Sequence, residues 1–483
     1  MLLHGLLGVP LIGALLLLVW GHRRLAAEMN VLFSFITLLF AVALAVRVMR
    51  EGPMEFDGGW FFMDAFNVFL VGLTALVGLT TALFSRPYMR IECAHGRLNP
   101  ARLRLYHASY QVFIAAMLLA LTTNNMGILW VSMEGATLAT VLLVSLYRTP
   151  AALEAAWKYF ILCGVGIAQA LFGTVLLYFA AEKVLGAGGN ALLWTHLNAV
   201  KAHLEPTVLQ LAFVFLLVGY GTKVGLVPLH SWLPDAHAEG PTPISAVLSG
   251  LLLNVALYAI LRNKVLVDGA IGTQLAGHLM MGFGLLSVVV ASFLIGQQGD
   301  VKRMFAYSSI EHMGMMTFAF GMGGAVAVFA GLLHMTVHSL TKSAIFFTVG
   351  HATQKAGTQL MSGIRGLMGI NPGLGWGLML GTMSILGVPP FGVFTSEFLI
   401  VITAMHEHGW AIPFLLVALG VAFAAIFGQV QAMVFAQTSL PRLPYQPAMT
   451  PVFLHLILVL ILGIAMPGWL AVWYRQAAHL LGA

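Results

Sequence analysis

The chain has 483 residues, of which 60% are hydrophobic and only 8% are charged, and its mean hydropathy is +0.93. Soluble domains carry roughly a quarter charged residues, so this composition excludes a soluble protein and indicates a membrane protein with many spanning helices. The net charge of +6 fits topology signals better than nucleic-acid binding, and two cysteines, Cys93 and Cys163, are too few for an iron–sulfur cluster or a disulfide framework. Any redox chemistry is therefore expected on a partner.

Apolar segments long enough to cross a bilayer follow one another along the chain. A spanning helix needs about 20 predominantly apolar residues. This rule predicts an all-α fold with fourteen spans: 2–20, 30–48, 62–84, 108–125, 127–147, 157–180, 207–229, 243–262, 274–296, 305–325, 327–350, 373–404, 411–436 and 451–474. An even number of spans places both termini on the same side of the membrane.

Two of the predicted spans contain prolines that interrupt a helix. Pro228 lies in the seventh span, and Pro389 and Pro390 lie in the twelfth, where proline removes a backbone donor and clashes with the preceding turn. Since the broken spans are five positions apart, we expect two inverted five-helix repeats: spans 4–8 (108–262) and spans 9–13 (263–436). A three-helix segment (1–107) precedes the repeats and a C-terminal helix (437–483) follows them. Paired broken helices are typical of transport pathways.

Basic residues are concentrated in the loops on one side of the predicted bundle. The larger set includes Arg23, Arg24, Arg97, Arg148 and Lys302. The opposite loops and helix ends hold fewer, among them Arg262 and Lys264. The positive-inside rule therefore places both termini outside the cytoplasm, in what we expect to be a bacterial inner membrane.

Four ionisable residues fall inside the predicted spans: Glu134, Lys223, Lys342 and Glu397. A central charge costs about 2.5–3.5 kcal/mol on insertion scales, so each residue needs a compensating partner or a function. One interpretation is a set of structural ion pairs that hold the helices together. The other is a proton relay, because burial lowers the pKa of a lysine and raises that of a carboxylic acid, so that both approach neutral pH. If Glu134 approaches Lys223, the lysine holds its proton; if Glu134 moves away, the lysine releases it.

His334, His338 and Lys342 recur every four residues. On a helix they form one stripe about 12 Å long. Because histidine titrates near neutral pH, the stripe suits proton transfer, and the alternative is hydrogen bonding between neighbouring helices. We favour the relay since Lys342 shares the face.

His230, Asp235 and His237 lie beside the break in the seventh span. Zinc usually needs three or four protein ligands, and no further partner is evident nearby, so we expect no metal site. Their position favours proton uptake or loop capping. Glu311 and His312 stand near a helix start, where function and capping are not separable. Lys158 follows Glu154 by four residues, which predicts a helix-end salt bridge, with membership of the relay as the alternative.

Several segments of the sequence together resemble those of one family. They are SMEGATLAT around Glu134, GTKVGLVPLHSWLPDAHAEGPTPISA around Lys223, DVKRMFAYSSIEHMG at 300–314, HMTVHSLTKSAIFFTVGH at 334–351 and GVPPFGVFTSEF at 387–398. The chain resembles the antiporter-like subunits shared by respiratory complex I, membrane-bound hydrogenases and Mrp-type antiporters. Within that family, YRTPAALEAAWKYFILC and AYSSIEHMG are most similar to component F of hydrogenase-4 and formate hydrogenlyase-type complexes. The resemblance implies fourteen helices, inverted repeats and proton translocation along a polar axis at mid-membrane.

The resemblance also assigns residues. Glu134 matches the glutamate of the fifth helix, Lys223 the lysine of the seventh, and Glu397 the terminal lysine or glutamate of the broken twelfth. Asn254 is a departure, since several relatives carry a lysine or histidine in the eighth helix. Asparagine does not titrate, so the central transfer is expected to use water or the stripe from His334 to Lys342.

We therefore expect a proton-translocating subunit of a redox-driven complex, an ion-translocating part of an oxidoreductase with no cofactor of its own. Iron–sulfur and nickel–iron centres are expected on partners, which would be other membrane subunits and a peripheral redox arm. Protons would be taken up near His230–His237 or at the second break, pass Lys223, the histidine stripe and Lys342, and leave by Glu397. The alternatives are a Mrp-type Na⁺/H⁺ antiporter subunit, a subunit that energises inorganic-carbon uptake, and a passive structural spacer.

Overall fold

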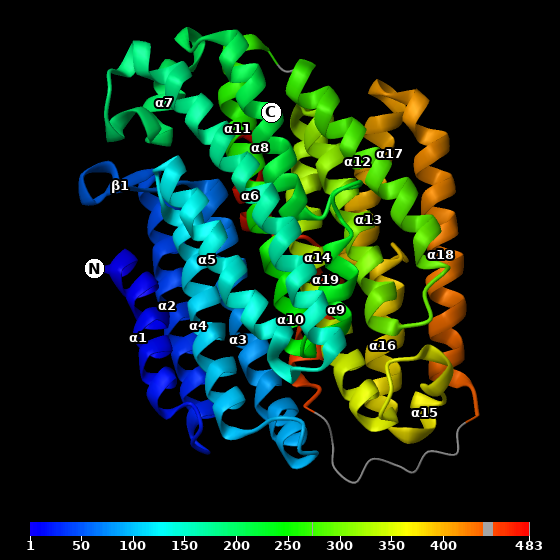
Figure 1. The fold of residues 1–483 in the computed structure, drawn as a ribbon. Coiled ribbons are helices and arrows are strands. Elements are labelled where there is room, and N and C mark those ends of the chain that lie inside the picture. The colour runs from blue at the N-terminus through cyan, green and yellow to red at the C-terminus, as the bar shows by residue number, and fades with distance from the viewer. Residues whose placement is uncertain (273, 438–447, 483) are drawn as a thin grey trace.

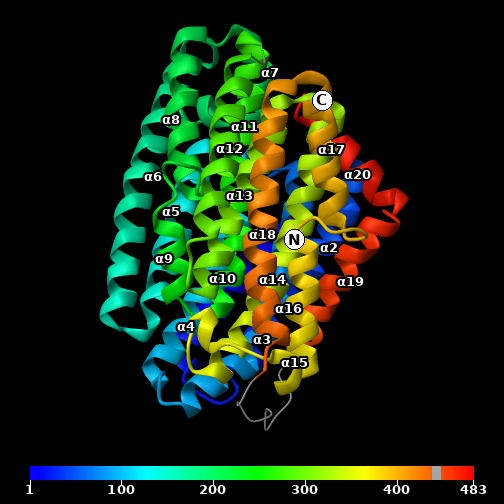
Figure 2. The same ribbon diagram turned by 90° about the vertical axis from the view of Figure 1, so that its right-hand side faces the viewer.

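The computed structural model describes residues 1–272, 274–437 and 448–482, which form a bundle of long helices (Figures 1 and 2). The start of the predicted C-terminal segment, 438–447, lies outside the described residues. The helices of the described chain are α1 (Leu2–Trp20), α2 (Ala26–Glu51), α3 (Ala65–Ala94), α4 (Pro100–Thr122), α5 (Met126–Val144), α6 (Pro150–Leu185), α7 (Trp194–Val200), α8 (Pro206–Val224), α9 (Trp232–Glu239), α10 (Thr242–Val247), α11 (Leu253–Ile271), α12 (Gln274–Ile295), α13 (Val301–Met322), α14 (Gly324–Ala356), α15 (Leu367–Ile370), α16 (Pro372–Ile385), α17 (Gly392–Glu407), α18 (Ile412–Phe435), α19 (Thr450–Ile464) and α20 (Gly468–Leu480). A short antiparallel hairpin, β1 (Met54–Phe56) with β2 (Phe61–Met63), joins α2 to α3.

The all-α membrane fold is confirmed, but fewer than fourteen helices have the length and apolar character of a span. Eleven helices in the described ranges are long and apolar enough to cross a membrane, or twelve if the bent pair α19–α20 is one span. The helices outside this set that matched predicted spans are α13 and the pair α16–α17. α13 carries three charged residues, and α16 and α17 have only 14 and 16 residues each.

Both predicted helix breaks are present. α8 ends at Val224, where Gly225 adopts a left-handed φ of 80°, and the chain resumes as α9 at Trp232 beyond Pro228. α16 ends at Ile385, and α17 begins at Gly392 beyond Pro389 and Pro390. A side chain is disfavoured at a left-handed φ, so glycine suits the residue at which α8 ends, and proline prevents the helix from continuing at both breaks.

The eighth and last predicted spans are less regular than expected. Between α10 and α11, residues Leu248–Leu252 form a π-helical turn, an irregularity that no sequence pattern predicted. The helix predicted over 451–474 is in fact two helices, α19 and α20, that meet at 81°. Pro467 stands directly before α20, where it starts a new helix with its fixed φ and no amide donor.

The central element of the bundle is α14, which lies among the other helices in both views (Figures 1 and 2). It packs against α3, α10, α13, α16, α17 and α19. Almost every side chain from Ala327 to Gln354 is buried. Polar residues on α14 therefore face protein rather than lipid.

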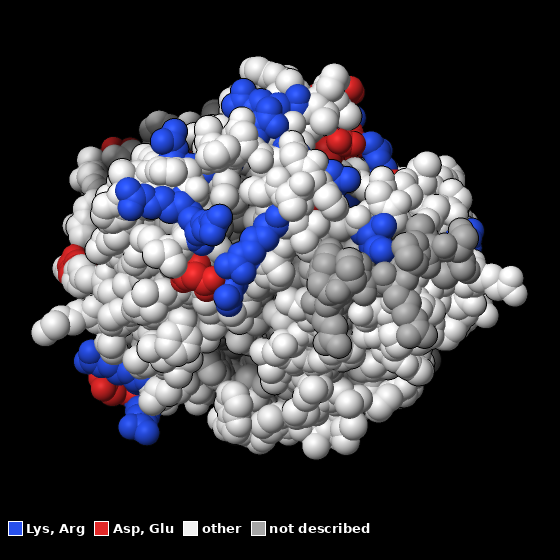
Figure 3. All heavy atoms as spheres, turned by 90° about the horizontal axis from the view of Figure 1, so that it is seen from below, with Lys and Arg blue, Asp and Glu red and all other residues white. Residues whose placement is uncertain are grey.

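The turns α1–α2, α3–α4 and α5–α6 lie at the lower end of the bundle in Figure 1. They carry the exposed residues Arg23, Arg24, Arg97 and Arg148. Seen from below, this face displays more Lys and Arg than Asp and Glu (Figure 3). The predicted gathering of basic residues at one end of the bundle is therefore present.

The expectation that the eighth span ends at Arg262, with Lys264 in the following loop, is wrong. α11 continues to Ile271, so both residues are helical and buried, and Lys264 pairs with Asp268 one turn later. Arg262 forms a bidentate ion pair with Asp64, with N–O distances of 2.7 and 2.9 Å. Four aromatic rings surround its guanidinium with centroids at 4.4–5.8 Å: those of Phe62, Phe66, Trp194 and Tyr258. This pair ties the N-terminal segment to the first predicted repeat.

Replacing Arg262 with alanine is expected to destabilise the protein by about 3–5 kcal/mol, because it leaves the Asp64 carboxylate buried without its partner. Asp64 also caps α3 through the amides of Phe66 and Asn67, so a shift of the carboxylate would disturb that helix start. Thermal unfolding of the purified protein in detergent measures the effect. The exposed Arg50→Ala at the end of α2 is the control, and equal melting of both variants would contradict a structural role for the pair.

Candidate functional site

Lys223 is fully buried one residue before the end of α8. Its ammonium donates a hydrogen bond to the hydroxyl of Thr137 on α5 and lies 5.3 Å from the ring centroid of Tyr159 on α6. The helix break therefore holds a lysine at a junction of three helices. Cys163, also buried, adds a thiol near the same ammonium.

Glu134 lies one turn before Thr137 on α5 and is partly buried. Its Oε2 atom is buried and has no hydrogen-bond partner in the described parts of the chain. Glu134 and Lys223, both well described, influence each other electrostatically, but their charged atoms are more than 4 Å apart and form no ion pair. The structure thus brings the two predicted partners near each other, with the Thr137 hydroxyl bound to the lysine.

His334, His338 and Lys342 lie on one continuous helix, as the four-residue spacing predicts, and all three are fully buried. The rings of the two histidines stack with centroids 6.4 Å apart. The Lys342 ammonium donates to the carbonyl of Phe305 on α13 at 3.0 Å. Both ring nitrogens of His338 are without a partner among described residues, and buried polar groups of this kind are usually satisfied by water.

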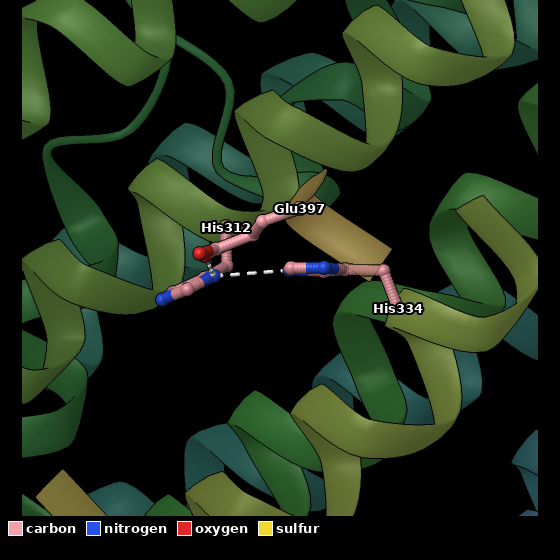
Figure 4. A group of neighbouring side chains, drawn as sticks. All are labelled: His312, His334 and Glu397. Carbon is pink, nitrogen blue, oxygen red and sulfur yellow. Dashed lines mark hydrogen bonds and ion pairs between the residues drawn. The ribbon is translucent and has the colours of Figure 1, made fainter. Parts of the chain in front are cut away.

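At one end this stripe meets His312 on α13 and Glu397 on α17 (Figure 4). His312 Nδ1 is 3.0 Å from His334 Nε2 and 3.6 Å from Glu397 Oε1. The other ring nitrogen of His334, Nδ1, is 2.8 Å from the Ser396 hydroxyl. Three helices therefore bring two imidazoles and a carboxylate together, whereas the sequence alone did not separate a role of His312 from helix capping.

Glu311 and Gly387 complete the surroundings of Glu397. Glu311 is buried beside His312 and is coupled electrostatically both to Lys342 and to Glu397. The Glu397 carboxylate packs so closely on Gly387 at the break before α17 that a side chain there would collide with it. Glu311, Gly387 and Glu397 also line a cavity of about 340 Å³ that opens between α13, α17 and α18.

In the segment His230–His237, Asp235 and His230 contact different neighbours. Asp235 accepts ion pairs from Lys158 (2.5 Å) and Arg303 (2.8 Å), so it ties α9 to α6 and α13. Lys158 therefore pairs with Asp235, and the predicted helix-end bridge to Glu154 is wrong: the tertiary partner replaces the local one. His230 instead lies near the ring of Tyr307, with centroids 6.1 Å apart.

His237 is buried and stacks on Phe346 of α14 with a centroid distance of 5.0 Å. Neither ring nitrogen has a hydrogen-bond partner within the described chain. The charges of Lys302 and Lys342 both act on it, so His237 is close enough to each lysine to feel its charge. The expectation that Lys302 is a loop residue is wrong, because it is buried on α13 and donates to the carbonyls of Ala238 (2.8 Å) and Gly240 (2.6 Å).

A polar pocket of about 410 Å³ opens next to Lys302. Its wall includes Tyr88, Arg97, Glu239 and Thr242 together with Lys302. Glu92, one turn after Tyr88 on α3, is completely buried, pairs with Arg97 at 3.4 Å and accepts from Gln354 at 2.7 Å. No sequence pattern singled out Glu92, since it stands close to the basic loop that follows α3.

Asn254 is buried on α11 and faces α14. Its side-chain amide donates to the Ser339 hydroxyl at 2.8 Å and to the carbonyl of Met335 at 3.2 Å, and its Oδ1 has no partner within the described ranges. Asn254 therefore links the two predicted repeats near the π-helical turn. Its neutral amide binds α14 by hydrogen bonds and contributes no titratable group there.

The buried polar side chains form a series of proton donors and acceptors. The series begins on α5 and α8, continues on α9 and α13, and ends on α14 and α17. The described residues of this set contain carboxylates, lysines and imidazoles, which exchange protons, and hydroxyls and amides, which orient water. Ionisable groups are energetically unfavourable inside an apolar bundle, and where they occur they commonly mark an ion or proton path.

Comparison with known proteins adds the family. Residues 123–426 match the family described as NADH:quinone oxidoreductase/Mrp antiporter, transmembrane. The chain is 48% identical to the hydrogenase-4 component F homolog of Methylacidiphilum infernorum over 98% of both chains. It is 27% identical to an Na⁺/H⁺ antiporter subunit of Alkalihalophilus pseudofirmus over 88% of this chain and 84% of that one.

Solved structures of two membrane complexes contain chains with a similar fold. A chain of the archaeal membrane-bound sulfane sulfur reductase superimposes with a TM-score of 0.90 at 27% identity, covering 99% of this chain and 97% of that one. A chain of the Mrp complex from Dietzia superimposes with a TM-score of 0.87 at 18% identity over the same shares, which supports the fold. The chain belongs to the NADH:quinone oxidoreductase/Mrp antiporter transmembrane family, as an antiporter-like membrane subunit.

Proposed function

We propose that this subunit carries protons across the membrane along its buried ionisable residues, as part of a redox-driven complex of the hydrogenase-4 type. The observation that carries the proposal is the series of buried acids, lysines and histidines that runs between the two broken helices. The 48% identity to a hydrogenase-4 component F homolog supports the type of complex. The electron path would lie on partner subunits, with iron–sulfur and nickel–iron centres there and no cofactor in this chain.

In the first half, Glu134 controls Lys223. When the carboxylate is charged and close, it stabilises the ammonium, and when it withdraws, the buried lysine releases its proton. The separation of the two charges beyond 4 Å corresponds to the withdrawn arrangement. Thr137 keeps the lysine oriented in either case, because it accepts the ammonium's hydrogen bond.

In the middle, His237 transfers protons between the two halves. It feels the charges of both Lys302 and Lys342, and its ring nitrogens are free of protein partners among the residues described, which leaves them available to water. The pocket beside Lys302 would give aqueous access from the basic face. We therefore assign proton uptake to this pocket. Asp235 would support it by holding α9 through its ion pairs with Lys158 and Arg303. His230, on the chain that leads into α9, is a second candidate for uptake.

In the second half, the proton passes from Lys342 along His338 and His334 to His312 and Glu397. The separations of 3.0 Å and 3.6 Å within the final group permit direct transfer with small side-chain motions. Glu397 lies beside the second break and the cavity next to α18, so it is the release point. Glu311 supplies the charge that controls Lys342, as Glu134 does for Lys223.

This assignment rests on two related five-helix units. α4, α5, α6, α8–α9 and α10–α11 would form the first, and α12, α13, α14, α16–α17 and α18 the second. In each unit the second helix carries a buried or partly buried glutamate and the fourth is broken. α6 contacts α8 as α14 contacts α17, which supports the correspondence. We propose that α13 and α16–α17 also cross the membrane, giving fourteen spans, with residues 1–107 and 437–483 flanking the two units.

The basic face would lie in the cytoplasm of a bacterial cell and both termini outside it, by the positive-inside rule. A Mrp-type Na⁺/H⁺ exchange is the second candidate, favoured by the likeness to an Na⁺/H⁺ antiporter subunit. The nitrogen-rich cluster at Glu397 argues for protons instead, since Na⁺ is coordinated by oxygen, as other hard cations are. A third candidate uses the same proton path but couples the proton movement to a partner that takes up inorganic carbon.

Gentle purification from the native membrane tests the type of complex. Co-purifying subunits with iron–sulfur clusters are expected, and electron transfer in reconstituted vesicles should acidify one side. Co-purification with cofactor-free membrane subunits alone, together with sodium-dependent proton flux, would contradict redox-driven pumping and favour the Mrp-type function.

Replacing Asn254 with alanine is expected to leave proton translocation close to the parent rate. The change removes hydrogen bonds to α14 that contribute about 1 kcal/mol each, but no titratable group. Vesicle acidification and thermal stability should be measured together. A severe loss of translocation in a stable variant would show that Asn254 organises water needed by the path.

A further inference from the structure

We propose that His312, His334 and Glu397 form a binding site for a divalent transition-metal ion, with Zn²⁺ as the best-matched occupant. One ligand atom from each residue lies within 4.8 Å of the other two, and all three residues are buried (Figure 4). The three residues lie on α13, α14 and α17, far apart in the sequence. No local spacing pattern could therefore indicate the site.

The spacing of the ligand atoms suits zinc. Zn–N and Zn–O bonds of about 2.0–2.2 Å in a tetrahedral site place neighbouring ligand atoms about 3.3–3.6 Å apart. His312 Nδ1 is 3.0 Å from His334 Nε2 and 3.6 Å from Glu397 Oε1. Small side-chain shifts would admit the ion, with no change of backbone.

The protonation of His334 is favourable as well. The Ser396 hydroxyl donates to the carbonyl of Val393 (2.9 Å), so it accepts a hydrogen bond from His334 Nδ1. The lone pair of His334 is then on Nε2, which faces the cluster. An outer hydrogen bond of this kind fixes the orientation of metal-binding histidines. Glu397 Oε1 has no hydrogen-bond partner in the described chain and is therefore free to coordinate.

Charge and access decide which ions fit. Burying a dication is unfavourable unless acids compensate it, and Glu397 and Glu311 together supply two carboxylates, opposed by Lys342 on the far side of His338. The 340 Å³ cavity reaches Glu397 and leaves space for the water that would fill a fourth position. Two imidazole nitrogens select zinc and its first-row neighbours over Na⁺, Mg²⁺ or Ca²⁺, which prefer oxygen.

The metal would occupy the lone pairs that the proton path uses. This consequence rests on the proposed function: zinc at the site would stop protons between His334 and Glu397 and so inhibit translocation. Binding itself does not depend on that function, because it follows from the ligand atoms alone.

Zinc titration of the purified, zinc-depleted complex in nanodiscs tests the site by calorimetry, with X-ray absorption at the zinc edge to identify the ligands. One site with two imidazoles and oxygen ligands is expected. His312→Ala should weaken binding beyond the roughly 10–100-fold typical of outer-shell changes. His338→Ala is the matched control, because this buried neighbour lies on the same helix as His334 but contributes no ligand atom.

Glu397→Gln provides a second variant that keeps the volume of the side chain and should also weaken binding. Unchanged zinc affinity in both His312→Ala and Glu397→Gln, or a spectrum with a single imidazole, would overturn the proposal and assign binding to surface histidines such as the exposed His278. If zinc binds as expected but leaves proton flux unchanged, the site stands and the route through His334 and Glu397 is wrong.

Discussion

Lys223→Ala is expected to abolish proton translocation while the complex still assembles and transfers electrons. Lys223 lies in the last turn of α8, at the first helix break, and its fully buried ammonium binds Thr137 close to Glu134. Removing it deletes the proton carrier of the first half and leaves the Glu134 charge without its counterpart. Redox-driven acidification of reconstituted vesicles, measured with a pH-sensitive dye, gives the result, and the expected rate is the background of uncoupled vesicles.

Two further variants separate the proton from the charge. Lys223→Arg keeps a positive charge but holds its proton throughout the working pH range, so it should also fail to translocate. Lys183→Ala, on the exposed end of α6, is the matched control and should translocate at the parent rate. Full pumping by Lys223→Arg would contradict a relay through this residue and favour a structural charge.

Most of the fold was predictable because the bilayer imposes a length on apolar segments and because proline interrupts helices. Pro228 and Pro389 marked both breaks correctly. The extra bend before α20 was not predicted: the apolar run continues through Ala465 and Met466, and the single Pro467 was assigned to one continuous helix. The π-helical turn after α10 left no trace in the sequence, since its apolar residues are compatible with an ordinary helix.

The candidate site was predictable residue by residue but not as a group. The spacing of His334, His338 and Lys342 placed them on one face, because they share one helix. No spacing relates His312 to Glu397, since their contact depends on how α13 packs against α17. For the same reason Lys302 was wrongly predicted in a loop and Arg262 at the end of a span. Inside the bundle, Asp64 satisfies Arg262 and two backbone carbonyls satisfy Lys302.

The two helix breaks differ in the groups that they hold. The first places a lysine beside a hydroxyl and a nearby acid, an arrangement that stores a proton and releases it when the acid withdraws. The second places a carboxylate beside two imidazoles and a cavity, an arrangement that can accept protons from the imidazoles. In the proposed function, this difference favours a direction from Lys223 toward Glu397.

Glu397→Gln is accordingly the second variant with a large expected effect: translocation should fall to background with assembly intact. Glutamine fits the space beside Gly387 and keeps a polar contact to His312, but it neither accepts nor releases a proton. Protons that reach His334 then lose the acceptor carboxylate that lies 3.6 Å from His312, and only Glu311 remains as an acid at the cavity. The same vesicle acidification assay measures the loss.

Glu407→Gln is the matched control, because it is the same substitution at the exposed end of the same helix, α17, and should pump at the parent rate. Thermal stability of both variants must match the parent for the comparison to hold. If Glu397→Gln translocates protons normally, release must bypass the second break, and the cavity at α18 would lose its role. If Glu397→Asp restores translocation where Glu397→Gln does not, the position requires a titratable acid, and this requirement supports release at α17 as the last step of the path.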